Sequence, residues 1–146
     1  MSTQNKEDAV GRFVESYASN IAAGDDAALT AQFAEMFMAG GPGGITALRA
    51  VDFAKALPKR RQLFADIGHR SSSLVGVEQR RLTDRFWLVT TRWLMSFDEG
   101  ETGSAEEIES EAVLIVDAGS EPFRIVFFLH SEDVLALRCK GRDQLA

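Results

Sequence analysis

Two side chains in the second half of the chain have the residue types and the spacing for acid–base chemistry. Glu111 alternates with Val113 and Ile115 in a strand-like run, and such apolar neighbours would desolvate its carboxylate and raise its pKa. His130 ends the next apolar run, and a neutral histidine beside a carboxylate can exchange protons at about pH 7. Plainer readings stay open. Two further glutamates share the parity of Glu111 and indicate a solvated face, and the plainer reading of His130 is a hydrogen-bonded histidine at the rim.

Further polar residues stand within apolar patterns. Tyr17 lies on the apolar face of an expected helix, either as a core tyrosine or as part of a pocket wall. Arg92 interrupts an apolar strand, and it either pairs with an acidic neighbour across the sheet or holds an anionic group of a ligand. Because ligand pockets are mostly apolar, the aromatic core residues are also candidate pocket walls: Phe33, Phe37, Phe53, Trp93 and Phe128.

The motifs that bind metals and nucleotides are missing from the sequence. Cys139 is the single cysteine, which excludes an intrachain disulfide and a thiolate zinc cluster. His69 follows Gly68 at an expected helix end, and we interpret it as structural or solvated. Residues 40–44 read GGPGG, but no Gly-Lys-Ser/Thr follows as in a phosphate-binding loop, and no dinucleotide glycine pattern occurs. We therefore expect no metal and no cofactor.

The composition is typical of one globular domain. The 146 residues are 45% apolar and 26% charged, and the apolar runs are too short to cross a membrane. A net charge of −6 disfavours nucleic acid as a partner, and the polar start does not resemble a signal peptide. We expect a cytoplasmic protein with a polar tail over 1–6, one domain over 7–140 and a C-terminal tail over 141–146.

The first half of the chain has helical periodicity. Apolar residues from Lys6 to Ala23 recur with the spacing of an amphipathic helix, which Gly24 would end. Asp25 or Asp26 is expected to cap a second helix. A third helix is expected from Thr46, with Pro58 breaking it or opening a short turn, and Gly68 ends the helical half. The apolar face of the second helix would be Ala28, Leu29, Phe33, Met36 and Phe37, with the glycines 40–44 after it.

The second half reads as strands joined by short polar turns. Residues 71–82, 86–97, 108–116 and 123–130 are rich in branched and aromatic side chains and predict an antiparallel meander. Helices followed by strands make the fold class α+β. Both faces of 86–97 are apolar, whereas a strand with one wet face alternates more cleanly. We therefore expect a homodimer that forms through the sheet.

This order of elements resembles the nuclear transport factor 2-like superfamily. The resemblance rests on a first helix that ends AAGDDAALTAQFAE, a Gly/Pro loop, a third helix and a curved sheet, and it spans about Lys6 to Leu137. The superfamily includes SnoaL-like polyketide cyclases, ketosteroid isomerases and many uncharacterised bacterial proteins. It implies N-terminal helices packed into a curved antiparallel sheet, a cone-shaped α+β barrel with a pocket at its wide end.

The resemblance also suggests roles for single residues. Tyr17 stands seven residues before Gly24, where ketosteroid-isomerase-like members have a tyrosine that donates to the substrate oxygen. Glu111 falls near the place of a second acid, although that family prefers aspartate. The family's general base precedes a proline, and here Gly41 precedes Pro42. Because glycine cannot remove a proton, we exclude ketosteroid isomerisation of that type.

Three functions follow as hypotheses. The leading one is binding of a small, largely apolar or amphipathic molecule in the cone pocket. The second is a SnoaL-like or isomerase-like enzyme, a cyclase, isomerase or dehydratase, in which Glu111 or His130 is the acid–base group. The third is a dimerisation or partner-binding module whose cavity is filled by side chains.

Overall fold

The computed structural model describes residues 3–98 and 106–130. Cys139, the predicted C-terminal tail and the first two residues of the predicted N-terminal tail lie outside these ranges. Three helices and six strands make up the described part of the chain. In chain order they are α1 (Thr3–Ala23), α2 (Asp26–Thr30), β1 (Phe33–Gly41), β2 (Gly44–Arg49), α3 (Ala50–Asp66), β3 (His69–Arg81), β4 (Phe86–Phe97), β5 (Glu106–Asp117) and β6 (Arg124–His130).

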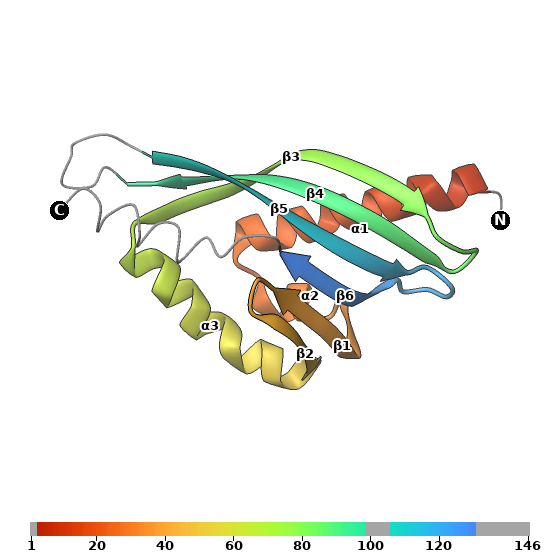
Figure 1. Cartoon of the computed structure of the whole chain (residues 1–146), viewed down its shortest axis with the longest axis horizontal. Helices are drawn as coiled ribbons and strands as arrows, with labels where there is room; N and C mark the ends of the chain where they lie inside the picture. The colour runs from red at the N-terminus through yellow and green to blue at the C-terminus, as the bar shows by residue number, and fades with distance from the viewer. Residues whose placement is uncertain (1–2, 99–105, 131–146) are drawn as a thin grey trace.

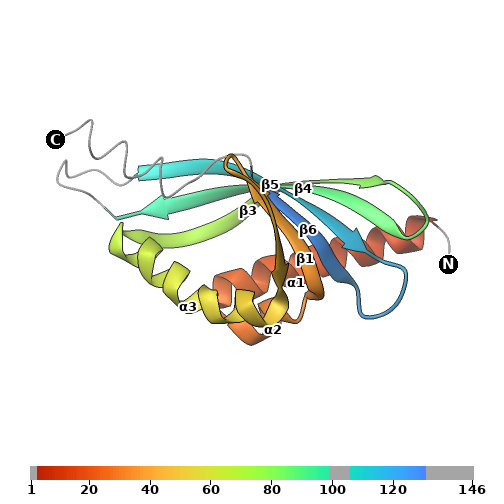
Figure 2. The same ribbon diagram turned by 60° about the horizontal axis from the view of Figure 1, so that its bottom comes forward.

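The strands form one curved sheet with the helices on one of its faces (Figure 1 and Figure 2). Their order is β2-β1-β6-β5-β4-β3, so β2 and β3 are the edges. The predicted antiparallel meander is confirmed for β3 to β6. The first hairpin adds β1, which pairs in parallel with β6. The fold class α+β is therefore confirmed, with a mixed sheet in place of the expected antiparallel one.

The junction between α1 and α2 follows the sequence prediction. Gly24 has a φ of +66°, a left-handed conformation that glycine adopts without steric cost. The Asp25 side chain then accepts a hydrogen bond of 3.1 Å from the backbone amide of Ala28. This bond satisfies one of the free amides at the start of α2. The chain thus turns sharply after α1 and enters the sheet soon afterwards.

The prediction that the second helix continues through Phe37 is wrong. The helix α2 ends at Thr30, and Phe33 starts strand β1. Phe33 and Phe37 are four residues apart, which places them on one face of a helix and equally on one face of a strand. This segment forms a strand because it pairs with β2 on one side and with β6 on the other. The predicted start of α3 at Thr46 is also wrong, because residues up to Arg49 form β2.

The glycine-rich run is the tight turn of the β1–β2 hairpin. Gly41 pairs with Gly44, which has a φ of +121°. Helix α3 then continues through Pro58, so the expected break at this proline does not occur. Gly68 ends the helical part with a φ of +88°, as predicted.

The core lies between α1 and the concave face of the sheet. Val10, Val14 and Tyr17 of α1 are buried against inward side chains of the central strands. Burial identifies the inner face of β4. Arg92 is exposed, and the buried side chains are Trp87, Val89, Thr91, Trp93 and Phe97. Each fully buried large apolar side chain contributes about 1.5–3 kcal/mol.

Candidate functional site

Four of the five aromatic side chains predicted as pocket walls pack together with Tyr17, whereas the Phe128 ring lies beside His130. Phe33 lies 4.6 Å from Phe37 and 4.8 Å from Phe53 between ring centroids. Tyr17 meets Phe33 at 6.3 Å and the edge of Trp93 at 6.2 Å. We call these five residues the aromatic cluster. Its rings fill the space between α1, α3 and the sheet. These residues are therefore part of the core, which is one of the two roles that the sequence allowed for them.

Tyr17 is inside this cluster with 5% of its surface exposed. Burial raises the pKa of its hydroxyl well above the ordinary value, because the phenolate would lose its hydration. The neutral phenol is therefore the stable form over the usual pH range. A neutral phenol donates a hydrogen bond and does not remove a proton.

A buried polar chain connects β4 to β5 beside Tyr17. The Trp93 indole Nε1 donates to the Thr91 hydroxyl at 2.9 Å, and that hydroxyl donates to the Ala112 carbonyl at 2.9 Å. Thr91 is completely buried. These bonds satisfy polar groups that would otherwise destabilise the core.

His130 lies on the concave side, against the β1–β2 hairpin. It pairs with Ala112 of β5, and its ring is 5.8 Å from the Phe128 ring. A Cβ atom placed on Gly41 would lie only 2.8 Å from His130 Cε1. The imidazole therefore occupies the space that a side chain at Gly41 would need, which explains why glycine stands before Pro42.

Arg92 and Glu111 lie on the opposite side of the sheet. They are cross-strand partners on β4 and β5, and their inward neighbours Trp93 and Ala112 are buried. The Arg92 guanidinium lies over Gly76 of β3. The predicted juxtaposition of Glu111 and His130 on one face therefore does not occur, because Glu111 faces outward with Val113 and Ile115. His130 lies on the concave side opposite Ala112, and Tyr17 of α1 packs separately against Phe33 and Trp93.

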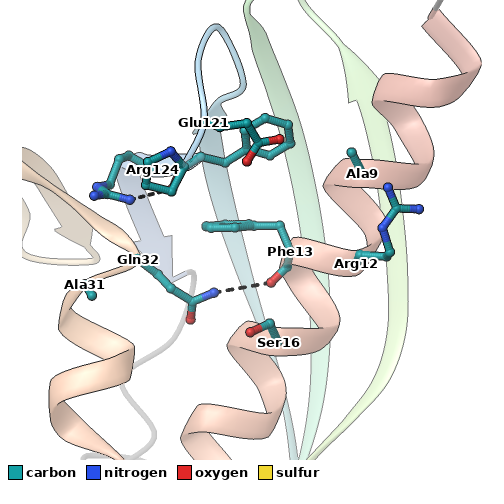
Figure 3. Close-up of a pocket in the computed structure, with 10 residues that line it drawn as sticks. Ala9, Arg12, Phe13, Ser16, Ala31, Gln32, Glu121 and Arg124 are labelled. Atoms are coloured by element: carbon teal, nitrogen blue, oxygen red, sulfur yellow. Dashed lines mark hydrogen bonds between the residues drawn. The ribbon is translucent and has the colours of Figure 1, made fainter. Parts of the chain in front are cut away.

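A cleft of about 520 Å³ opens on the other side of α1 (Figure 3). We call it the α1 cleft. Three segments far apart in the sequence form it: the exposed side of α1, the link between α2 and β1, and the turn between β5 and β6. Its lining residues are Ala9, Arg12, Phe13, Ser16, Ala31, Gln32, Glu121, Pro122, Phe123 and Arg124.

Hydrogen bonds fix the floor of the α1 cleft. The Gln32 amide donates to the Phe13 carbonyl at 3.4 Å and accepts from the Asn20 amide at 3.0 Å. Figure 3 shows Gln32 beside Phe13. The Phe13 and Phe123 rings pack at 6.2 Å. The floor is therefore apolar, with one amide that two hydrogen bonds orient.

The rim of the α1 cleft carries both signs of charge. Arg12 of α1 is exposed, and Arg124 is half-buried and donates to the Phe123 carbonyl at 3.2 Å. Figure 3 shows these cations on opposite walls, with the Glu121 carboxylate between them. Two guanidinium groups against one carboxylate favour a ligand with an anionic group.

The α1 cleft was not predicted from the sequence. Arg12 and Phe13 read there as ordinary residues of an amphipathic helix, and residues 117–122 as a polar turn. The only signal was the pair Phe123–Arg124 directly after that turn, which places an aromatic ring and a cation at a strand start.

The described residues offer neither a metal centre nor a membrane-spanning helix. Within residues 3–98 and 106–130, no group of three or more His, Cys, Asp or Glu side chains could hold a metal ion. None of the helices in the same ranges is long and apolar enough to cross a membrane.

Sequence comparison gives no relatives for this chain. No family model matches it, and no curated protein matches it. Structural comparison does find similar folds. The chain is similar to Aln2 from a Streptomyces species, at a TM-score of 0.70 and 13% identity, covering 95% of this chain and 98% of that one.

Two further structures give the same result. An NTF2-like protein with a cystatin-like fold from Novosphingobium aromaticivorans has a TM-score of 0.67 at 12% identity, covering 92% of this chain and 89% of that one. An NTF2-like protein of unknown function from Shewanella oneidensis has a TM-score of 0.66 at 15% identity, covering 86% and 98%. At this identity the likeness concerns the fold alone. The chain therefore has the nuclear transport factor 2-like, or cystatin-like, fold that its order of elements predicted.

Proposed function

We propose that this protein binds a small amphipathic molecule with an anionic group, and that the α1 cleft is the binding site. The observation that carries this proposal is the cleft itself, a hollow of about 520 Å³ with phenyl rings on its floor and arginines on its walls. That volume lies within the range of small-molecule sites, which are mostly apolar with a few fixed polar groups. The ligand class is the one expected from the sequence, but the proposed site is on the outer side of α1 and not in the interior of the cone.

The lining assigns a role to each part of such a ligand. An apolar or aromatic body would lie on Phe13 and Phe123. Its anionic group would be held by Arg12 or Arg124, whose planar guanidinium groups suit carboxylates and sulfonates. The Glu121 carboxylate repels an anionic ligand. It therefore lowers the affinity and disfavours ligands with a large negative charge.

Titration with an anionic aromatic probe, 8-anilinonaphthalene-1-sulfonate, tests this proposal. Arg12→Gln and Arg124→Gln should each weaken binding about three- to tenfold, as expected when one charge-assisted contact at an exposed site is lost. Glu121→Gln should strengthen binding. Arg80→Gln is the matched control, because Arg80 is exposed on β3 away from the cleft and its loss changes the net charge equally.

The neutral analogue 1-anilinonaphthalene separates charge from apolar contact. It should bind more weakly than the sulfonate and should respond little to either arginine substitution. Equal effects of Arg12→Gln, Arg124→Gln and Arg80→Gln would show that the probe senses net charge only, and would overturn the assignment of the site.

The enzyme hypothesis is retained as a second candidate, with His130 in place of Glu111. It is supported by the position of His130, which pairs with Ala112 on the concave side of the sheet, while Glu111 faces away. A histidine is suited to proton transfer next to a carbonyl. A cyclase or isomerase of this kind would lose activity on His130→Gln and keep it on Arg12→Gln.

A further part of the proposal concerns the outer face of the sheet. Met36, Met38 and Ile45 are 55%, 38% and 57% exposed on the outer side of the β1–β2 hairpin, and exposed apolar side chains that gather on one face mark interaction surfaces. We propose that a second copy of the chain covers this face and forms the predicted homodimer. The third hypothesis, a module with a filled interior, shares this dimer and differs in lacking a ligand.

A further inference from the structure

A serine and a histidine are in hydrogen-bond contact on the edge strand β3. His69 Nε2 lies 2.8 Å from Ser72 Oγ. This distance is within the range of about 2.6–3.2 Å that joins a nucleophile to its base in enzymes. Neither residue lines the α1 cleft or belongs to the aromatic cluster.

A β-bulge brings this pair together. Residues three apart in a regular strand point to opposite faces of the sheet. Here His69 pairs with Phe97 and Ser71 with Ser96, so Arg70 is an extra residue in the ladder. The insertion places Ser72 opposite Met95, on the same face as His69. Bulges redirect side chains in this way, and they are frequent beside active sites.

The imidazole is held in place by aromatic rings on both sides. The His69 ring lies 5.5 Å from the Phe64 ring and 5.6 Å from the Phe97 ring, in edge-on geometry at 66° and 68°. Burial lowers the pKa of His69, and a hydrogen bond with the Ser71 backbone offsets this lowering in part. The ring is therefore neutral at ordinary pH and can accept a proton.

We propose that Ser72 is a nucleophile that His69 activates as general base, which would give this chain an acyl-transfer site separate from the α1 cleft. The Ser72 oxygen attacks the carbonyl carbon of an activated ester while its proton moves to His69 Nε2. The carbon–oxygen bond to the leaving group then breaks, and that alkoxide takes the proton from His69. Water repeats the sequence on the acyl-serine, releases the acid and restores both side chains.

The surroundings indicate the class of ester. Phe64 and Phe97 form a small apolar cluster together with Ile67, Met95 and Ile108. An ester with a short apolar acyl group fits this environment. The nearby ion pair of Arg70 with Asp98 is exposed on both sides, so an acyl group with a strong charge has no buried partner in the described part of the site.

Labelling of the full-length protein with a fluorophosphonate tests the proposal, because such reagents phosphonylate activated serines. Ser71 and Ser73 are internal controls: they flank Ser72, face the other side of the sheet and are more exposed. Peptide mapping should show that Ser72 is modified at least about a hundredfold faster than either flanking serine, as general-base assistance implies. His69→Gln should reduce that rate to the level of the flanking serines, and Ser73→Ala should leave it unchanged.

Two outcomes would overturn the proposal. One is modification of Ser72 no faster than Ser71 and Ser73 in the unaltered protein, a comparison that needs no variant to fold. The other is a Ser72 rate that persists in His69→Gln when circular dichroism shows a native fold. A purely structural hydrogen bond would give the first result, since burial alone slows the reaction of Ser72.

Discussion

At the scale of single residues, Tyr17 offers a direct test of the packed interior. It is the single tyrosine of the chain, so its ionisation can be followed without interference from other phenols. Because burial raises its pKa, the native protein should show no phenolate absorbance at about pH 11, where a free tyrosine is mostly ionised. Denaturant should restore titration with a midpoint of about pH 10.

The same shift predicts how stability depends on pH. The pKa of Tyr17 is higher in the folded than in the unfolded state. The contribution of Tyr17 to the free energy of unfolding is therefore complete below about pH 10, and it falls as the pH rises toward the folded pKa. Tyr17→Phe should remove this part of the alkaline loss of stability, as measured by urea unfolding. A native phenolate that titrates at about pH 10 would show instead that water reaches Tyr17.

Gly41 and Gly43 form a matched pair in the β1–β2 hairpin. A Cβ at Gly41 meets the His130 ring at 2.8 Å, whereas one at Gly43 meets nothing within 4 Å. Gly41→Ala should therefore displace the imidazole and cost about 1–3 kcal/mol, while Gly43→Ala should be close to neutral. The histidine NMR resonances report the displacement, since the chain has only two histidines. Unchanged His130 resonances in Gly41→Ala would refute this packing.

The candidate site residues could be predicted only in part. The sequence identified Tyr17 and His130 as polar groups near aromatic residues, and both lie on the concave side of the sheet. It could not decide whether Arg92 or Trp93 faces the interior, because both faces of β4 are apolar and a register shift of one residue exchanges the two side chains. The pairing puts Arg92 and Glu111 on one face, and the burial of their neighbours Trp93 and Ala112 shows that this face is the outer one.

At the scale of elements, Thr91 connects two central strands and orients Trp93. Its hydroxyl accepts from the indole and donates to the Ala112 carbonyl. Thr91→Val keeps the shape but leaves the indole Nε1 without a partner, which should cost about 1–3 kcal/mol. In a Trp93→Phe background the same change should cost less, because no donor remains unsatisfied. Chemical denaturation of the four proteins measures this coupling, and equal costs in both backgrounds would contradict the bond.

The elements themselves show where local patterns decide the structure and where they do not. The pattern of α1 predicts a helix because its apolar residues recur at helical spacing from Ala9 to Ile21, over more than three turns. The segment from Phe33 to Gly41 has too few repeats, since a spacing of four fits both a helix and a strand. One of its two strand partners is β6, the last strand of the described chain. The α1 cleft was missed for the same reason, because its walls meet only after the sheet has formed.

At the scale of the whole molecule, the outer face of the sheet is where two copies of the chain are proposed to meet. Ile45 pairs with Gly40 across the hairpin, and Gly40 with Leu129 of β6, so one apolar band crosses from the edge strand to the centre. Val113 of β5 continues it opposite Leu129. Arg92 and Glu111 border this band with one charge of each sign, which lets two identical faces pair about a twofold axis.

Light scattering during size-exclusion chromatography tests this arrangement. The unaltered protein should elute as a dimer, and Met38→Lys or Ile45→Lys should weaken the dimer at least about tenfold, because each would bury an unpaired charge in the interface. Leu63→Lys is the matched control, because Leu63 is a comparably exposed apolar side chain on α3. A monomer at all concentrations, or equal dissociation by Leu63→Lys, would show that the exposed methionines and Ile45 have another role. If only the hairpin variants dissociate, the contact between the two sheets includes the outer face of the β1–β2 hairpin.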